Sequence, residues 1–402
     1  MLSFRDALAR LLAVVPVARE EVCRIEGAAG RVLRREVKAN RDFPAFDRVM
    51  MDGFALRAGD WEKGIREFQV AGSAPAGAPR MSFDDVAAGR HNPLCVEVMT
   101  GAPCPSGADA IVPVEEVLRR GDGRVIFREA KVVAGEFIHR AGSDARKGSV
   151  LLEEGGVLGG RELGVAASCG AAELWVSALP KIAVLATGDE LVAVDETPLP
   201  HQIRQSNAHA IGASLQRTGY PVRTSGVLGD EVDASRDILT KILEEHDWVI
   251  LTGAVSMGAR DFVPALLDEL GCKKLFHGVA QRPGKPAGCW IGPAGQIVMT
   301  LPGNPVSALT GLHVFVLPAL AKSAELKESP RRLVVMEDRQ VRLPGMTRHL
   351  PVRLRADGRA EPAPPGNSGD FIGLLSSDGC VTLPPRGEDS GFISAFHFTP
   401  WL

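Results

Sequence analysis

Apolar residues near the start of the chain recur three or four positions apart. Between Ser3 and Leu12 they form one stripe, which predicts an amphipathic helix. From residue 44 to about 136 the pattern changes to short β-like runs separated by Gly and Pro clusters, which is typical of a small β-rich domain. Residues 137–178 return to strand, turn and helix character, and a helix is expected at Gly160–Ser168.

The middle of the chain alternates strands with helices. Ile182–Ala186 is a continuous apolar run, as expected for a strand that is buried on both faces. Strands and helices then alternate up to a long helix expected from Pro305 to about Ala321, and this alternation predicts a mainly parallel, doubly wound sheet. After about Ser329, short strands with Pro and Gly turns predict a small β-barrel or sandwich.

Length, composition and charge limit the class of protein. A chain of 402 residues exceeds what one hydrophobic core organises, so about two to four domains are expected. Apolar residues make up 45% and charged residues 24%, as in ordinary soluble proteins. The net charge of -3 argues against nucleic acid as the main partner, although a local pocket on such a protein can still be positive.

Cysteine usage and the N-terminal sequence indicate a location. The seven cysteines include no C-x-x-C pair and fit the reduced thiols of a cytoplasm. The first residues lack the features of a signal peptide, and no apolar run reaches membrane-spanning length. We therefore expect a soluble, cytoplasmic protein with no membrane partner.

Glycines and small polar residues follow the predicted strands of the doubly wound region. In an open parallel sheet, ligands bind beyond the carboxyl ends of the strands. The segments at that edge are Thr187 to Glu190, Gly229 to Glu231, Thr252 to Gly258, Arg282 to Lys285, and Pro302 to Ser307. Together they supply more acids, bases and hydroxyls than turns alone require, so this edge is the expected site.

The last of these segments predicts an anion site. Gly303 permits close approach of a ligand, Asn304 can cap the following helix, and Pro305 suits its first position. The free N–H groups and the helix dipole then favour an anion, to which Ser307 adds a hydroxyl. The alternative is a capped helix with nothing bound.

Charged residues follow the same strands. Glu190, Asp230 and Asp261 offer hard oxygen ligands of the kind that hold Mg²⁺ together with a substrate phosphate. Singly, Asp261 is better explained as a helix cap, and Glu190 and Asp230 as solvated loop acids, but the convergence of all three on one sheet edge favours the metal site. Lys285 is a cation on a stiff loop beside the anion segment, or else a solvated surface lysine. The chain contains neither a dinucleotide fingerprint nor a P-loop, and no H-x-x-x-H pair supports a zinc enzyme.

Several short motifs occur along the chain in a fixed order. They are M-D-G-F-A (51–55), M-T-G-A-P-C-P (99–105) with A-D-A-I-V-P-V-E (108–115), A-T-G-D-E-L (186–191), T-G-A-V-S-M-G (252–258) with Asp261, R-P-G-K-P (282–286) and L-P-G-N-P-V-S-A (301–308). Over essentially the whole chain, this series resembles the MoeA family of molybdopterin molybdenumtransferases. One such motif is weak evidence, whereas the ordered series is strong.

The resemblance implies an α/β multidomain protein. The implied parts are an α+β connecting and dimerisation domain (1–43 and 137–178), an inserted β-rich domain (44–136), a molybdopterin-binding α/β domain (179–328) and a C-terminal β-barrel (329–402). Members of the family are homodimers whose active cleft is shared between subunits, which gives Asp52 and Thr100 a role across the interface. From the residues alone, both are favoured as members of tight turns.

The resemblance also implies a reaction. Members of the family convert adenylylated molybdopterin and molybdate, with Mg²⁺, into molybdenum cofactor and AMP. By resemblance, Glu190, Asp230 and Asp261 hold the Mg²⁺ and act in catalysis with Lys285. The implied substrate-binding residues are Asp52, Thr100, Thr187, Gly188, Asn207, Gly253, Ser256, Gly258, Arg282, Gly303, Asn304, Pro305, Ser307 and Arg348. Asn207 either contacts the substrate or caps its helix. An adenylyltransferase and molybdoenzymes are the expected partners.

The sequence departs from the family pattern at a few positions. Ala254 stands where a second glycine is usual, and Gly278 and Arg282 stand where many members carry lysines. Ser143 replaces a common glutamate, and residues 48–50 replace small polar residues. These changes bear on the affinity for the oxyanion and leave the expected fold unchanged.

Two alternatives remain open at the level of sequence. One is a CinA-like nucleotide pyrophosphatase, which would share the doubly wound domain but would not need the upstream motifs. The other is a weakly active paralogue or a scaffold that binds molybdopterin, like the gephyrin E domain. The retained acids and Lys285 favour an enzyme.

Overall fold

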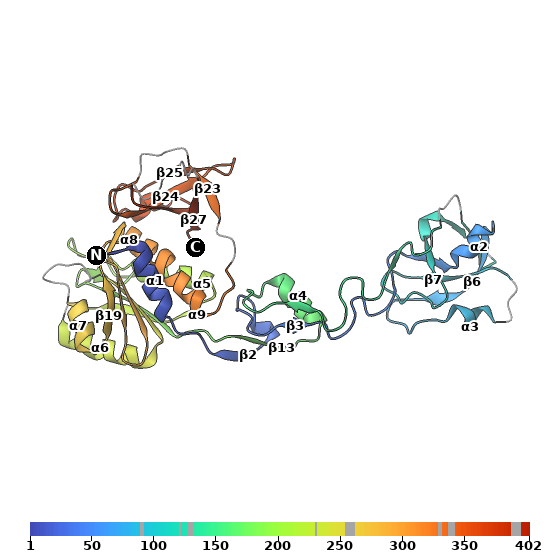
Figure 1. The fold of residues 1–402 in the computed structure, drawn as a ribbon, viewed down its shortest axis with the longest axis horizontal. Coiled ribbons are helices and arrows are strands. Elements are labelled where there is room, and N and C mark those ends of the chain that lie inside the picture. Colours follow the sequence, from blue (N-terminus) through green and yellow to red (C-terminus); the bar gives the residue numbers. More distant parts are fainter. Residues whose placement is uncertain are drawn as a thin grey trace. The chain divides into compact units, whose positions relative to one another are not determined.

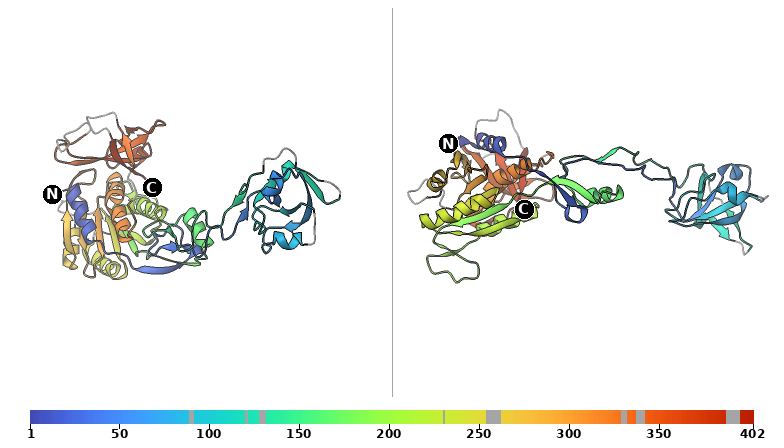
Figure 2. Two further views of the ribbon diagram at one scale, coloured as in Figure 1. Left: turned by 45° about the vertical axis from the view of Figure 1, so that its right-hand side comes forward. Right: turned by 90° about the horizontal axis from the view of Figure 1, so that it is seen from below.

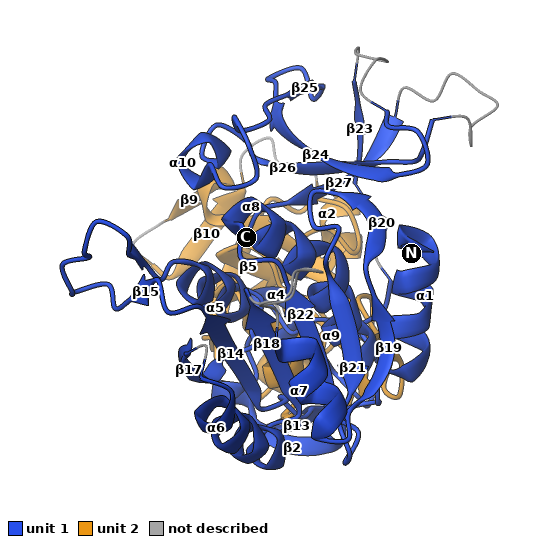
Figure 3. Ribbon diagram, turned by 90° about the vertical axis from the view of Figure 1, so that its left-hand side faces the viewer, with its two compact units in different colours: residues 1–35, 154–163, 173–402 blue, residues 36–153, 164–172 orange. Residues whose placement is uncertain are grey.

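The chain forms two compact units (Figure 3). The computed structural model describes residues 1–88, 92–119, 122–127, 132–229, 231–253, 262–328, 332–336, 342–386 and 395–402. The larger unit comprises Met1–Arg35, Glu154–Leu163 and Glu173–Leu402, and the smaller unit comprises Glu36–Glu153 and Gly164–Ala172. The four domain boundaries expected from the sequence remain a prediction.

A six-stranded mixed sheet forms the centre of the larger unit. Its spatial order is β17 (Val222–Leu228), β14 (Ile182–Thr187), β18 (Trp248–Thr252), β22 (Ile297–Leu301), β21 (Gly288–Ile291) and β19 (Lys273–His277). The first four strands pair in parallel, whereas β21 and β19 are antiparallel to their neighbours. The mainly parallel sheet is therefore confirmed, with an antiparallel edge that the sequence did not indicate.

Helices cover both faces of this sheet (Figure 1). One face packs against α1 (Phe4–Val14), α5 (Asn207–Arg217), α8 (Pro305–Gly311), the π-helical turn Leu312–Val316 and α9 (Leu317–Ser323). The other face packs against α6 (Val232–Glu245) and α7 (Val263–Glu269). Along β14 the side chains alternate, so Ile182 and Val184 enter the first core and Ala183 and Leu185 the second. The sheet is doubly wound, as predicted.

Two helical predictions can be compared directly with the structure. Helix α1 begins after Ser3, whose hydroxyl accepts a hydrogen bond from the Asp6 amide at 3.1 Å, and it buries Leu11 completely. The long helix expected from Pro305 is continuous to Ser323 but contains the π-helical turn. By length and composition this helix could cross a membrane, but 78% of its most apolar window is buried in the protein, as in a core helix.

A second sheet joins the C-terminal domain to the α/β core. Its order is β1 (Leu2–Ser3), β20 (Val279–Arg282), β24 (Thr347–Leu354), β26 (Gly379–Leu383), β27 (Ala395–Pro400) and β23 (Leu333–Val335), with β25 (Ala360–Pro362) also paired to β24. A bridge between Met336 and Ala360 brings β25 back beside the end of β23, so these C-terminal strands form a ring around a small core. Strand β20 therefore links the two lobes of the larger unit, which are the α/β core and the C-terminal domain.

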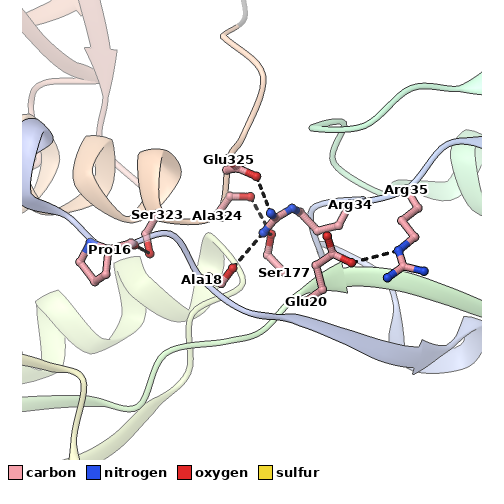
Figure 4. A network of polar contacts seen from close by, with 9 residues as sticks. All are labelled: Pro16, Ala18, Glu20, Arg34, Arg35, Ser177, Ser323, Ala324 and Glu325. Carbon is pink, nitrogen blue, oxygen red and sulfur yellow. Dashed lines mark hydrogen bonds and ion pairs between the residues drawn. The ribbon is translucent and has the colours of Figure 1, made fainter.

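Short elements complete the larger unit. These are β2 (Glu20–Arg24), paired with β13 (Glu173–Ser177), the 3₁₀ turn Ile25–Gly27, β15 (Leu191–Val192), paired with β16 (Ile203–Arg204), and helix α10 (Phe371–Leu374). Beside the β2–β13 ladder, the largely buried Arg34 guanidinium contacts Ala18, Ser177 and Glu325 (Figure 4). This contact holds the N-terminal segment against the residues that follow α9.

The smaller unit contains the β-rich region expected between residues 44 and 136 (blue to green in Figure 2). Its sheet has the order β8 (Ala110–Pro113), β5 (Gly53–Leu56), β7 (Leu94–Val98), β6 (Glu67–Ala74), β10 (Arg124–Phe127) and β9 (Val117–Arg119). The short elements around it are α2 (Ala58–Glu62), α3 (Phe83–Ala87), the 3₁₀ turn Val114–Glu116, and the pairs β4 (Arg48–Val49) with β11 (Ile138–His139) and β3 (Val37–Lys38) with β12 (Val150–Leu152). Helix α4 (Gly160–Ser168) includes residues of both units.

Candidate functional site

A pocket of about 490 Å³ lies within the larger unit, where its two lobes meet. Its walls come from Gln281–Pro286, from the start of α8, from β24 and from the loop 364–368. Strands β20 and β24 are hydrogen-bonded neighbours, so one sheet carries residues of both lobes into the pocket. The sequence predicted the first two of these walls and left out the last.

Three cationic side chains line the pocket: Arg282, Lys285 and Arg348. Arg282 and Arg348 are register partners on β20 and β24, so both leave the sheet on the same face. Lys285 follows on the exposed loop after β20. None of the described residues that line the pocket is acidic, so the three positive charges make it favourable for an anion.

Hydroxyl and amide groups complete the lining. Ser307, in the first turn of α8, is 3% exposed, and Pro305 occupies the first helical position as predicted. Asn304 stands at the N-cap, but its side chain makes no capping bond and its Nδ2 donates to Ser368 Oγ at 3.0 Å. The Val306 amide, which a cap would bind, instead donates to the Ser368 carbonyl at 3.1 Å. The capping role expected of Asn304 is therefore wrong.

Another group of predicted residues meets at the carboxyl edge of the central sheet. Asn207 donates its Nδ2 to the Gly303 carbonyl at 2.7 Å, while Ser206 takes the N-cap position of α5. Asn207 therefore ties α5 to the loop after β22 and is not the cap of its helix. At Gly253, where φ is 91°, an added Cβ would lie only 2.5 Å from the Thr187 carbonyl oxygen. Glycine lets these loops pack backbone against backbone.

Three polar side-chain atoms near this edge are buried and, among the described residues, have no hydrogen-bond partner. They are Gln205 Oε1, Asn207 Oδ1 and Thr252 Oγ1. Thr252 is the last residue of β18 and is 1% exposed, and its carbonyl accepts a bond from Thr187 Oγ1 at 3.2 Å. Leaving such an atom unpaired costs about 1–3 kcal/mol. These atoms mark where a polar ligand can bind.

Glu190 is the one predicted metal ligand that the structure describes. It is exposed in the turn after β14, and an added Cβ on Gly188 would collide with its carboxylate, so the side chain lies over that glycine. Four predicted residues lie outside the described part of the chain: Asp230, Ser256, Gly258 and Asp261. Within the described residues, no three His, Cys, Asp or Glu side chains form a group that could hold a metal.

The loop after β14 lies against the loop after β17. An added Cβ on Gly229 would lie 3.3 Å from Asp189 Oδ1, so the loops after β14 and β17 are in contact. Glu190 and Asp230 each follow directly on these two contacting residues. Among the described residues, this loop carries the neighbouring carboxylates Asp189 and Glu190, and carboxylate oxygens suit a hard cation such as Mg²⁺.

Asp52 and Thr100 belong to the smaller unit and contact each other. Both the amide and the hydroxyl of Thr100 donate to Asp52 Oδ1 at 2.7 Å. The amide bond first, and the hydroxyl bond second, lower the pKa of Asp52. The pair joins the turns at one end of β5 and β7, in agreement with the turn interpretation. A role across a subunit interface stays a prediction.

The structure adds pocket residues that the sequence reading missed. Ser368 and Asn367 come from the C-terminal domain, and Gln281 and His349 lie beside two of the cations. One signal was present: the run P-P-G-N-S at 364–368 has the Pro, Gly, Asn and hydroxyl composition of the anion segment at 302–307. The pairing of β20 with β24, which brings these segments together, has no local signature.

Comparison with known proteins agrees with this arrangement. Residues 2–170 match the model of the "MoeA N-terminal region (domain I and II)", and residues 183–322 match that of the "Probable molybdopterin binding domain". A protein of Synechocystis sp. named molybdopterin molybdenumtransferase is 35% identical over 402 residues, with 100% of both chains covered. The chain belongs to the MoeA family. A Mycobacterium tuberculosis protein named molybdopterin molybdenumtransferase 2 is 36% identical over 325 residues, 77% of each chain.

Solved structures share this fold. The crystal structure titled molybdopterin biosynthesis moeA protein from Pyrococcus horikoshii OT3 has a TM-score of 0.80 at 26% identity and covers 100% of both chains. A molybdenum cofactor biosynthesis protein from Pyrococcus furiosus has a TM-score of 0.58 at 20% identity, with 99% of this chain and 97% of that chain covered. The multidomain α/β architecture is thus that of MoeA.

The departures from the MoeA pattern can be located, apart from Ala254, which lies outside the described residues. Gly278 has φ of 82°, a conformation in which glycine is unstrained and a lysine would be strained. Arg48 and Ser143 meet in one cluster of the smaller unit. Arg48 Nη2 donates to His139 Nδ1 at 3.2 Å, and both His139 Nε2 and Ser143 Oγ bond to Asp144 Oδ1.

Proposed function

We propose that this chain is a molybdopterin molybdenumtransferase of molybdenum cofactor biosynthesis and that its pocket binds molybdate. The observation that carries the proposal is the lining of the pocket: three cations, two serine hydroxyls and no described acid. Molybdate is a tetrahedral dianion, and its four oxygens are satisfied by cationic and hydroxyl donors converging from different sides. Arg282, Lys285 and Arg348 supply the charge, and Ser307 supplies a hydroxyl.

Adenylylated molybdopterin is the proposed second substrate, bound along the carboxyl edge of the central sheet. The orphaned Thr252 hydroxyl and Asn207 carbonyl oxygen offer hydrogen bonds to its polar groups. Gly253 and Gly303 lie close together, with an added Cβ on Gly303 only 3.5 Å from Gly253 Cα, and this glycine surface admits a phosphate close to the backbone. Thr187, at the end of β14, and Gly188, which follows it, lie beside this surface, and Ser256 and Gly258 are assigned to the same substrate.

Mg²⁺ is the proposed metal, held by Glu190, Asp230 and Asp261. When bound, it would neutralise phosphate charge and polarise the phosphoanhydride. The residues of the chain bind and orient the metal and the oxyanion. The turn after β14 exposes Glu190 to solvent, and we assign Lys285, in the loop after β20, to the oxyanion. The products are molybdenum cofactor and AMP.

The proposed assembly is a soluble, cytoplasmic homodimer. Asp52 and Thr100 would then complete the active cleft of the other subunit, with an adenylyltransferase delivering the pterin and molybdoenzymes accepting the cofactor. Nucleic acid and membranes are not proposed as partners. The match of residues 2–170 to the MoeA N-terminal model disfavours a CinA-like pyrophosphatase, because such an enzyme would not need that region.

The direct test incubates the purified protein with adenylylated molybdopterin, molybdate and Mg²⁺. AMP and a cofactor that activates an apo-molybdoenzyme are expected. If neither forms, the proposed reaction is wrong, and retained binding of molybdopterin would then favour the scaffold alternative. A Glu190→Ala variant with full activity would disprove the metal assignment alone.

A second test concerns the oxyanion. Lys285→Ala should raise the KM for molybdate about tenfold, because one charge-assisted bond is lost, while kcat at saturating molybdate is kept. The matched control is Lys274→Ala, which removes a lysine of the same unit that pairs with Asp268 at 3.0 Å outside the pocket. Equal effects of the two variants would place the oxyanion elsewhere.

A further inference from the structure

A chain of hydrogen-bonded polar groups, most of them buried, lies beside the three cations of the pocket. His349 Nδ1 lies 3.1 Å from Thr382 Oγ1, His349 Nε2 lies 3.3 Å from Gln281 Oε1, and Gln281 Nε2 lies 3.0 Å from the Gly284 carbonyl. His349 is 1% exposed and Gln281 is completely buried. The chain therefore crosses from β26 through β24 and β20 to the loop that carries Lys285.

The direction of every hydrogen bond in this chain is determined. The Gly284 carbonyl can only accept, so the Gln281 atom facing it is the amide nitrogen and Oε1 faces His349. Oε1 can only accept, so His349 Nε2 carries the hydrogen. Burial lowers the pKa of His349 to about 3, so the ring is neutral and Nδ1 accepts from the Thr382 hydroxyl. Each group has one orientation that satisfies its neighbours.

Three of the four groups in this hydrogen-bonded chain are next in sequence to a cation of the pocket. Gln281 precedes Arg282, Gly284 precedes Lys285, and His349 follows Arg348. Neighbouring residues in a strand point to opposite faces of the sheet, so the inward bonds fix the backbone from which Arg282 and Arg348 project outward.

Backbone hydrogen bonds also hold the loop that carries Lys285. The Gly284 carbonyl accepts from the Ala287 amide at 3.1 Å as well as from Gln281, and the Lys285 carbonyl accepts from the Val279 amide at 2.8 Å. An added Cβ on Gly284 would lie 2.9 Å from Gln281 Nε2 at a φ of 91°, so only glycine allows this contact. The ring of Phe4 packs edge-on against the His349 ring, with centroids 4.7 Å apart, and adds an apolar contact to it.

We propose that the Thr382–His349–Gln281–Gly284 chain is the positioning device of the oxyanion pocket and sets the spacing of its three cations. The inference rests on the proposed function, because it assigns these hydrogen-bonded residues a role in molybdate binding. A tetrahedral ion is recognised by donors at fixed separations, so loosening the loop lowers affinity without removing any charge.

The test compares variants that break the chain with one that restores it. His349→Leu and Gln281→Met remove the hydrogen bonds of the chain and put an apolar side chain of similar size in place of the polar one. Each variant should weaken the binding of sodium molybdate, measured by calorimetry, roughly tenfold. His349→Gln offers an N–H and a carbonyl oxygen again and should recover most of the affinity. In the enzyme assay, KM for molybdate should rise while kcat stays near the wild-type value.

The matched control is His313→Leu. His313 is 3% exposed and neutral at physiological pH because burial lowers its pKa, and it bonds the Leu309 carbonyl at 2.8 Å and the Leu402 amide at 3.2 Å. It does not line the pocket. This variant should lower Tm as His349→Leu does and leave molybdate affinity unchanged. An equal loss of affinity in the control would overturn the proposal.

A second readout separates this inference from the proposed function. Hydrogen exchange of the Val279 and Ala287 amides reports the order of the loop without any ligand, and should accelerate in His349→Leu and Gln281→Met but not in His313→Leu. Unchanged exchange in the first two variants would refute the positioning role even if molybdate binds. A wild-type protein that binds no molybdate would refute the proposed function and its extension to this chain, whatever the exchange result.

Discussion

Removing the Arg34 guanidinium should destabilise the larger unit by about 3.5–5 kcal/mol. The Arg34 side chain is 11% exposed, and its Nη1 donates to the Ala18 carbonyl at 3.0 Å and to Ser177 Oγ at 3.4 Å (Figure 4). A hydrogen bond from a charged group contributes about 1.5–3 kcal/mol, and the bond at 3.4 Å falls at the low end. The pair with Glu325, which is 50% exposed, adds about 0.5 kcal/mol.

Arg34→Met keeps most of the apolar stem and deletes these contacts, so the loss reports the polar network. The Ser177 hydroxyl retains its bond to the Ala324 carbonyl at 2.6 Å, which limits the damage. Urea denaturation followed by tryptophan fluorescence measures the change, since the shift in midpoint times the m-value gives the free energy. Four of the five tryptophans, at 175, 248, 290 and 401, lie in the larger unit.

The control for this prediction is Arg24→Met. Arg24 is 69% exposed and pairs with Glu26, which is 67% exposed, at 3.2 Å. Its removal should change stability by no more than about 0.5 kcal/mol. Equal losses in the two variants, or a loss below about 1 kcal/mol for Arg34→Met, would refute the reasoning that burial makes the Arg34 contacts strong.

Three further outcomes are expected. Gly253→Ala should cost about 3 kcal/mol in urea denaturation, because φ is 91° and the new Cβ would lie 2.5 Å from the Thr187 carbonyl oxygen; a loss below about 1 kcal/mol would contradict this geometry. His349 is buried and neutral with its pKa lowered to about 3, so its contribution is complete above the unfolded pKa near 6.5 and is lost as the pH falls toward 3. His349→Gln should therefore reduce the acid-side slope of stability by about 1.4 kcal/mol per pH unit between these values, and parallel slopes would exclude it. Of the seven cysteines only Cys23 is not buried, so a disulfide reagent should modify one thiol rapidly in the native protein and all seven in urea; several fast thiols would show a more open core.

The elements of the larger unit were predictable where one local signal governs them. Helix α1 follows from its apolar stripe and the Ser3 cap, and β14 follows from a run of residues buried on both faces. Pro305 fixed the start of α8 because its ring suits the first helical position. In each case the deciding interaction lies within a few residues of sequence.

The candidate site was predictable only in part, because its second half depends on pairing between distant segments. The loop with Lys285 and the anion segment were visible as motifs after strands. The pairing of Arg282 with Arg348 joins residues 66 positions apart, and no local pattern records it. Asn304 shows the limit of a local rule: its sequence favours capping, but a carbonyl from the C-terminal domain takes the helix amide first.

The pairing of β20 with β24 also constrains how such a pocket can evolve. Because side chains alternate along a strand, a slip of one residue would replace Arg348 at the pocket by the buried Thr347 or His349. A register shift of two residues would keep the same face of the strand toward the pocket, but a single inserted residue in either strand would turn that face away and disrupt the pairing of Arg282 with Arg348. The loop 364–368 has no strand register, so its length can drift one residue at a time. Selection for ligands of different size is thus expected to act on that loop while the strands stay fixed.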